Sequence, residues 1–253
     1  QQAQRVKDFM NYTIMSEMKE YEAEFDQMLF YLPLSGSAFK KVYYDEVVGR
    51  AVSKFVPADD LVVPYATTDI YSASRITHVV DMSMNDIKKL QKAGFYRDVE
   101  ISDSMLIDTD TDEIQEEIDE LQGMEPSYGE SDQCELYEIH TDLDIPGYED
   151  LDAEGEPTGI KLPYVVTVAQ AGNKVLSIRR NFNPQDPLKK KINYFVQFKF
   201  LPGTGFYGFG LIHMIGGLTR TATAALRQLL DAGTLANLPA GFKSRGIRVR
   251  DDA

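Results

Sequence analysis

A glycine-rich hexapeptide is the first segment whose spacing could serve chemistry. Gly203-Thr204-Gly205-Phe206-Tyr207-Gly208 fits the pattern G-x-G-x-x-G, and it follows a predicted strand and precedes a predicted helix, as in dinucleotide-binding folds. Phe206 and Tyr207, however, are bulky where the chain must approach a pyrophosphate, and no second strand ending in an acid follows the helix. No G-K-[ST] signature occurs. The pattern favours a plain corner between strand and helix, with a nucleotide-binding enzyme as the alternative.

The residue types that most often act as catalysts or metal ligands are few and scattered. His78, His140 and His213 do not stand in a metal-ligand spacing, and Cys134 is the only cysteine, which excludes an internal disulfide. A structural role for Cys134 and His140 is favoured over a catalytic pair. No G-x-S-x-G or H-E-x-x-H signature occurs. We therefore expect a protein that is not an enzyme and that holds no metal or cofactor.

Acidic residues are concentrated in the middle of the chain. Residues 98–156 hold 23 Asp and Glu and no Lys or Arg, so the rest of the chain has a net charge of +9 although the whole chain has −14. Such a block is typical of a solvated, self-repelling face, and also of a surface that keeps a polyanion from adhering. Residues 108–119 resemble a calcium-binding loop only superficially, because Glu113 occupies the position that requires glycine. An acidic helix over residues 112–121 is the better interpretation.

A small basic cluster stands near the other end of the chain. Its members are Lys243, Arg245, Arg248 and Arg250. Two interpretations stay open, a solvated loop and a transient contact with phosphates in which each cation adds a salt-dependent increment. The overall charge of −14 argues against a module that wraps nucleic acid tightly.

The composition is that of a folded chain of one large domain or two small ones. Hydrophobic residues make up 43% of the 253 residues and charged residues 26%. The longest mostly apolar stretch, Phe206–Leu218, is too short to span a bilayer, so we expect no membrane contact. The chain begins at Gln1 without a Met or a signal peptide, which predicts an intracellular segment of a longer protein.

Two long helices and one short one are expected around several strands. A stripe of apolar residues at spacings of three and four predicts one helix over residues 1–31, roughly 45 Å long, that ends at Pro33 and Gly36. Ser83 is expected to cap a helix that stops at Gly94. The last helix should run from residue 209 or 211 to 230, with Gly216-Gly217 in its middle and Gly233 just past its end. The strands are predicted over residues 38–44, 52–56, 61–63, 75–80, 133–140, 164–169, 175–180 and 192–200.

Several strings of this sequence resemble one known family. The strings are Phe39–Asp45, Phe55–Tyr65 and Arg75–Val79 in the first part, and Asn181–Pro184, Phe206–Gly210 and Leu238–Lys243 in the second. They are similar to portal proteins of tailed bacteriophages, in the branch typified by short-tailed phages. The resemblance is densest over residues 181–253 and weakest over residues 98–156.

The resemblance implies an α+β portal-like fold with a wing, long stem helices and a β-containing clip. The implied regions are a wing over 1–80, a first stem helix over 81–97, an acidic segment and clip over 98–205, a second stem helix over 206–235 and the start of a tunnel loop at 236–253. Lys243, Arg245, Arg248 and Arg250 would belong to the tunnel loop. Arg220 and Arg227 would line the channel from the second stem helix.

The same resemblance implies the function and the partners. Portal proteins form a ring, usually of twelve subunits in the virion, at one capsid vertex, and double-stranded DNA is packaged and ejected through its channel. The implied partners are further copies of the chain, the major capsid protein, the terminase large subunit and a head-to-tail adaptor, and assembly takes place in the host cytoplasm. Twelve copies at −14 each would carry −168, and this charge would repel DNA and let it slide. The pair Gly216-Gly217 would let neighbouring stem helices pack closely.

Overall fold

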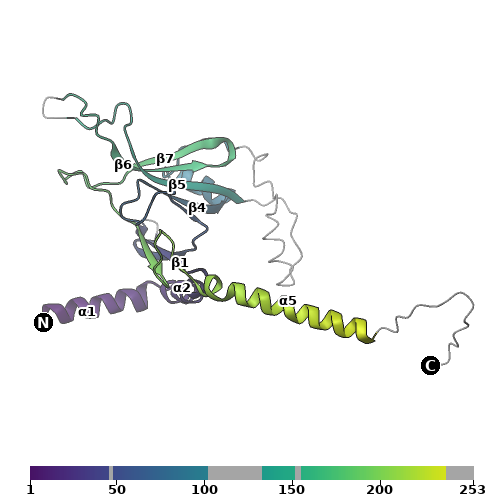
Figure 1. Cartoon of the computed structure of the whole chain (residues 1–253). Helices are drawn as coiled ribbons and strands as arrows, with labels where there is room; N and C mark the ends of the chain where they lie inside the picture. Colours follow the sequence, from purple (N-terminus) through teal and green to yellow (C-terminus); the bar gives the residue numbers. More distant parts are fainter. Residues whose placement is uncertain (46–47, 102–132, 152–154, 238–253) are drawn as a thin grey trace, which may run out of the picture.

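The computed structural model describes residues 1–45, 48–101, 133–151 and 155–237. The helices are α1 (Gln2–Tyr12), the π-helical turn η1 (Thr13–Glu17), α2 (Tyr21–Ser35), α3 (Met84–Lys92), the 3₁₀ turn η3 (Ala171–Asn173) and α5 (Leu211–Asn237). The strands are β1 (Ser37–Asp45), β2 (Arg50–Val56), β3 (Leu61–Val62), β4 (Arg75–Ser83), β5 (Gln133–Leu143), β6 (Leu162–Ala169), β7 (Lys174–Arg180) and β8 (Phe195–Lys199). The chain is therefore mixed α and β, which is compatible with the predicted α+β class (Figure 1).

The strands form two antiparallel sheets. The smaller sheet has the order β2-β1-β8, and the larger has the order β3-β4-β5-β6-β7. In the smaller sheet Lys41 of β1 pairs with Phe195 of β8. The strand β8, which precedes α5, therefore lies beside a strand from the first fifth of the chain. In the larger sheet β4 to β7 follow one another as a meander, with a register shift between Thr167 and Val168. We call these the three-stranded and the five-stranded sheet.

Apolar side chains from both sheets form one core between them. Phe39 and Phe195 of the three-stranded sheet pack with Leu61 and Ile76 of the five-stranded sheet, and Phe206 stacks on Phe39 with its ring centroid 5.8 Å away. Because side chains alternate across a strand, this packing fixes which face of each sheet points inwards. We call the face of the five-stranded sheet towards this core its inner face.

The short helix α3 covers the rest of that inner face. Ile87 is fully buried and packs in a cluster with Cys134, Leu136 and Leu176. The Ser83 hydroxyl accepts a hydrogen bond from the backbone N–H of Asp86 at 3.2 Å, so the predicted cap is confirmed. The range predicted as a first stem helix, 81–97, contains the end of β4, nine helical residues of α3 and a turn at Gly94.

The prediction of one helix over residues 1–31 is wrong. The chain leaves the helical conformation at Met18, whose φ of −88° and ψ of 73° end the π-helical turn, and α2 starts only at Tyr21. Glu20 at this break forms a bidentate pair with Arg50 of β2, at 2.6 and 2.7 Å, which holds α2 against the three-stranded sheet. Pro33 lies inside α2 and does not end it, whereas Gly36, with φ of 86°, does end it as predicted.

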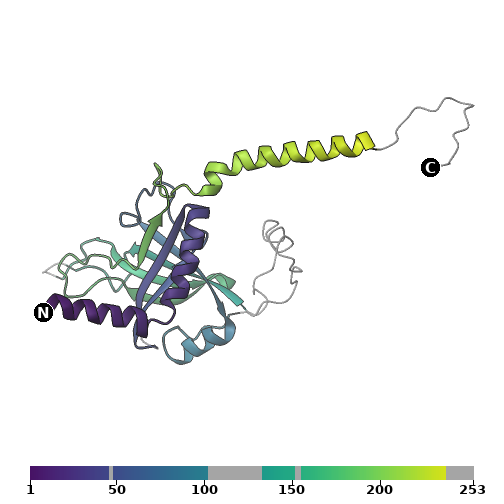
Figure 2. The same cartoon turned by 90° about the horizontal axis from the view of Figure 1, so that it is seen from below.

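The helix α5 leaves the body and extends away from it. Figures 1 and 2 show it projecting on one side of the molecule and α1 on the opposite side. The predicted stop at Gly233 is wrong, because the helix continues to Asn237. At about 1.5 Å per residue, its 27 residues span about 40 Å.

Most of the predicted strands are confirmed. The hairpin of β6 and β7 turns at η3, where Gly172 takes a φ of 75°, and β5 extends beyond its predicted end to Leu143. The expected strand over 192–200 is shorter and spans Phe195–Lys199. The expected acidic helix over residues 112–121 and the calcium-like loop over 108–119 lie outside the described residues.

Candidate functional site

The projecting helix α5 is the strongest candidate for a functional surface, because among the described residues its contacts with the rest of the chain lie at its start. Its side chains from Leu211 to Ala236 are exposed, apart from the partly covered Gly216. Large apolar side chains are among them: Leu218 is 73% exposed and Leu229 is 71% exposed. A 27-residue helix with exposed apolar side chains is unusual, and large exposed apolar surfaces are typical of sites that contact another molecule.

The exposed helix has an apolar and a polar face. With about 100° per residue, the polar face carries both arginines predicted to line a channel, Arg220 and Arg227, together with His213 and Asp231. Arg220 and Arg227 are seven residues apart and therefore lie on the same side, two turns from each other. The apolar face is formed by Leu211, Ile215, Leu218, Ala222, Leu226 and Leu229.

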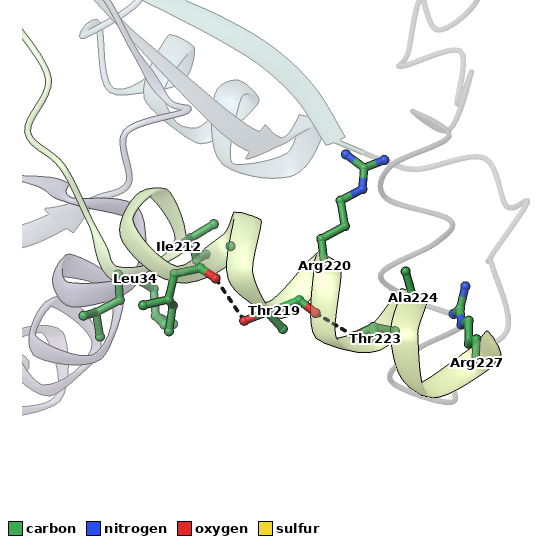
Figure 3. A pocket seen from close by; sticks show the side chains of 10 residues that line it. Leu34, Ile212, Thr219, Arg220, Thr223, Ala224 and Arg227 are labelled. Carbon is green, nitrogen blue, oxygen red and sulfur yellow. Dashed lines mark hydrogen bonds between the residues drawn. The ribbon is translucent and has the colours of Figure 1, made fainter. Parts of the chain in front are cut away.

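An open groove of about 890 Å³ runs along one flank between these two faces. Ile212 and Ile215 line its start beside Leu34 of α2, and Arg220 and Arg227 line its far end (Figure 3). The hydroxyl of Thr223 donates to the carbonyl of Thr219 at 2.9 Å, so the helix itself satisfies this polar group. The flank therefore offers methyl groups and small side chains to a neighbour, with two cations at its rim.

The start of α5 is fixed by a crossing of two glycine-containing segments. A Cβ on Gly208 would lie 2.5 Å from the carbonyl oxygen of Gly36, and a Cβ on Gly210 would overlap the carbonyl oxygen of Leu34. The backbone N–H of Gly208 donates to the buried hydroxyl of Ser37 at 2.7 Å. Only glycine allows so close an approach of two backbones, so the crossing sets the direction in which α5 leaves the body.

The hexapeptide with the dinucleotide-like spacing forms part of this crossing. Phe206 is buried in the core, and the carbonyl of Gly205 accepts from the Lys199 ammonium group at 3.2 Å. The backbone N–H of Gly208 donates to Ser37. Of the three glycines in the hexapeptide, only Gly205 has open space where a Cβ would be added. His213 follows in the first turn of α5, where its Nδ1 accepts from the N–H of Gly210 at 3.2 Å.

A second group of polar residues joins the two sheets, and the sequence analysis missed it. The ammonium group of Lys41 on β1 donates to Glu138 on β5 at 2.8 Å, and Nε2 of His140 lies 2.7 Å from the other oxygen of the same carboxylate. His78 on β4 lies 3.5 Å from the Lys41 ammonium group through its Nδ1. The ring of Phe195 stands edge-on to both imidazoles, with centroids 5.7 and 5.2 Å apart. We call Lys41, His78, Glu138 and His140 the inter-sheet cluster.

Burial and charge set the protonation of the inter-sheet cluster. Burial by itself would raise the pKa of Glu138, but the hydrogen bond from His140 and the charge of Lys41 hold that pKa well below its usual range. Burial, followed by the charge of Lys41, lowers the pKa of His78 to about 4. At neutral pH Glu138 is therefore ionised beside a cation and His78 is neutral. These are properties of a structural ion pair. The alternation of buried and exposed residues along β5 could have revealed the buried position of Glu138, since Glu138 lies on the same face of the strand as Leu136.

The structure brings some predicted site residues together and leaves others apart. Arg220 and Arg227 line one groove, whereas Cys134 and His140 lie six residues apart along one strand, roughly 20 Å from each other. The tunnel-loop candidates Lys243, Arg245, Arg248 and Arg250 lie outside the described residues.

The described residues contain neither a cluster of metal-ligating side chains nor a candidate membrane span. Among them, His, Cys, Asp and Glu nowhere form a group of three or more that could hold a metal ion. None of the helices described is both long and apolar enough to cross a membrane.

Comparison with known proteins gives no assignment, since neither a protein-family model nor a curated protein matches this chain.

Proposed function

We propose that the chain is a portal protein of a tailed bacteriophage, which forms the ring-shaped channel at one capsid vertex through which double-stranded DNA is packaged and ejected. The resemblance of its sequence strings to this family motivates the proposal, and the projecting helix α5 is the observation that carries it. A helix whose apolar face is in water within one chain gains stability when copies of itself cover that face.

The two faces of α5 suit a position around an axis. When neighbouring helices pack through the apolar face and the flanking groove, Arg220 and Arg227 stay together on one side of each helix. In a ring that side would face the channel and present regularly spaced cations to phosphates, while an overall charge of −14 per copy keeps DNA from binding tightly. The glycine crossing at Gly36 and Gly208 would give each copy the same helix direction, which a symmetric ring requires.

The proposed protein is a conduit and a docking platform without catalytic activity of its own. In this proposal the terminase large subunit supplies the energy of packaging, and the major capsid protein and a head-to-tail adaptor bind the outside of the ring. The location is the virion, after assembly in the host cytoplasm.

A pair of substitutions with equal changes of charge tests the proposal. Leu218→Asp places a carboxylate on the apolar face of α5, and Arg220→Gln changes the charge by the same amount on the opposite face. We expect rings of the unsubstituted protein in negative-stain micrographs, loss of rings for Leu218→Asp, and intact rings with altered DNA retention for Arg220→Gln. An unsubstituted protein that stays monomeric in sedimentation experiments at high concentration would contradict the proposal.

A further inference from the structure

The outer face of the five-stranded sheet, which points away from the core, is organised in rows across the strands. The register of the strands places residues from neighbouring strands directly beside one another, and every second residue faces the same side. Two adjacent rows are mainly apolar. One consists of Val62, Thr77, Ile139, Val166 and Ile178, and the next consists of Val79, Tyr137, Val168 and Val175.

These two rows form an apolar surface that the described part of the chain leaves open. Ile178 is 49% exposed and Val62 is 45% exposed, and the other members of the rows are partly exposed. In Figure 1 the sheet forms the upper layer of the body, and the described helices lie below or beside it. Sheets in folded proteins bury an apolar face against another layer, so this face is suited to a partner.

Charged residues stand at the two ends of the apolar rows. The row beyond Val79 and Tyr137 contains Asp81 paired with Glu135. At the opposite end, the outermost residues of β4 and β7 are Arg75 and Arg180. A partner that lies along the strands therefore meets two adjacent carboxylates at one end. At the other end the two guanidinium groups stand on β4 and β7, with Thr141 and the buried Tyr164 between them.

The helix α1 has the properties that such a partner needs. None of its residues is buried; Phe9 is 67% exposed and forms an apolar stripe with Val6 and Met10. The helix is about 16 Å long, and the distance between the acidic and the basic row is roughly 20 Å. Arg5 and Lys7 flank the stripe in its first half and are complementary to the acidic row.

We propose that the outer face of the five-stranded sheet binds helix α1 of a second copy of this chain, with Arg5 and Lys7 against Asp81 and Glu135. The contact joins two different surfaces, so it is heterologous and can repeat from copy to copy until a ring closes. It rests on the proposed function in that it names a contact between ring neighbours, separate from the contact made by α5. Within one chain the two surfaces lie on different parts of the body (Figures 1 and 2).

The contact area sets the strength to expect. The sheet face measures on the order of 500 Å², but a helix about 16 Å long and about 10 Å across covers only on the order of 160 Å² of it. Stable complexes commonly bury about 800 Å² on each partner. This contact is therefore weak when it acts alone and becomes effective where α5 supplies a second contact between the same two copies.

Cross-linking between two single-cysteine additions tests the proposal. Phe9→Cys and Ile178→Cys are made in separate full-length proteins, in which the natural Cys134 is buried and serves as an internal control. A short bismaleimide should join the two proteins when they are mixed and should not join either one to itself. Cross-links of Ile178→Cys with itself would show that two sheets pack face to face, and would overturn the proposal, as would the absence of cross-links in a mixture that forms rings.

A charge exchange separates this contact from that of α5. Arg5→Glu with Lys7→Glu should reduce the mixed cross-link at least tenfold, and Asp81→Lys with Glu135→Lys in the other protein should restore it. Leu218→Asp in α5 should abolish rings and leave a concentration-dependent cross-link. If the charge exchange changes nothing, α1 is not the occupant, whereas rings that survive Leu218→Asp would contradict the proposed function and leave this contact in place.

Discussion

Glu138 on β5 and Lys41 on β1 form a buried ion pair with 2.8 Å between the carboxylate oxygen and the ammonium nitrogen, and the pair joins the two sheets of the fold. Their side chains are 17% and 12% exposed. Since His140 bonds the second oxygen of Glu138, the carboxylate is satisfied from two elements of the body. The complete pair therefore costs the fold little free energy, whereas removal of one partner destabilises the fold strongly.

Removal of one member should destabilise the protein strongly. We expect Glu138→Gln and Lys41→Met each to lower the free energy of unfolding by about 3–5 kcal/mol, because each leaves a buried charge without its partner. The double variant should lose much less than the sum of the two. Urea denaturation of all four proteins measures this coupling, with Lys89→Met, in an exposed pair with Asp86, as a control that should change little. Additive losses would show that the two side chains act independently.

Acid should weaken the fold through His78. Its pKa is about 4 in the folded protein, below the usual 6.5 of an unfolded chain, so between these values the unfolded chain binds the proton more readily. The stabilisation is complete above pH 6.5, decreases as the pH falls and is lost by pH 4, a change of up to about 3 kcal/mol. Denaturation midpoints between pH 4 and 7 measure it.

A histidine substitution isolates this contribution. His78→Gln should flatten the pH dependence over that range, because the group that takes up the proton on unfolding is then absent. An unchanged slope in His78→Gln would assign the acid sensitivity to another group.

The glycine crossing should tolerate a methyl group at one glycine and not at another. Gly208→Ala places a Cβ 2.5 Å from the carbonyl oxygen of Gly36 and 2.8 Å from that of Leu201, both of them backbone atoms. We expect a loss of several kcal/mol or a change in the direction of α5. Gly205→Ala is the matched control in the same loop, because an added Cβ there meets nothing within 4 Å. Thermal unfolding and small-angle scattering compare the two, and equal behaviour would contradict the close approach.

The effect of alanine at Gly217 should change sign with assembly. Nothing lies within 4 Å of an added Cβ there, so Gly217→Ala should stabilise the helix of a single chain by up to about 1 kcal/mol. In a ring the same methyl group would separate neighbouring helices that approach closely at this glycine. Circular dichroism of the monomer and the yield of rings measure the two effects. A variant that gains helix and also forms rings more readily would show that Gly217 is not at a helix contact.

Local sequence patterns were sufficient for most of the strands and for the cap of α3. Alternation and turn residues identify β1, β6 and β7, and Ser83 identifies the start of a helix, because these signals act over a few neighbouring residues. The break at Met18 was missed because the apolar period continues through it, while Arg50, which pairs with the adjacent Glu20, comes from 30 residues away. Helix α5 passes Gly233 because no proline stands there and no other described residue packs against this turn to end it.

The candidate site was predictable only in part. The arginines of α5 follow from their spacing on a recognisable helix, so Arg220 and Arg227 could be paired in advance. The inter-sheet cluster could not be assembled in this way, because the pairing of β1 with β8 brings Lys41 beside Phe195 across more than 150 residues. No local pattern encodes that register. The same reason applies to the rows on the outer face, which exist only once the five strands of that sheet have found their partners.

The crossing at Gly36 also determines how the molecule would carry a mechanical load. The carbonyl of Gly36 accepts from Phe200, and the segment before α5 is bonded to Ser37 and paired with Leu201. A pull along the axis of α5 would thus reach several backbone bonds of two chain segments at once before any single one could open. Force applied to α5 is therefore distributed over several hydrogen bonds next to the three-stranded sheet. This arrangement suits a helix that has to withstand mechanical force.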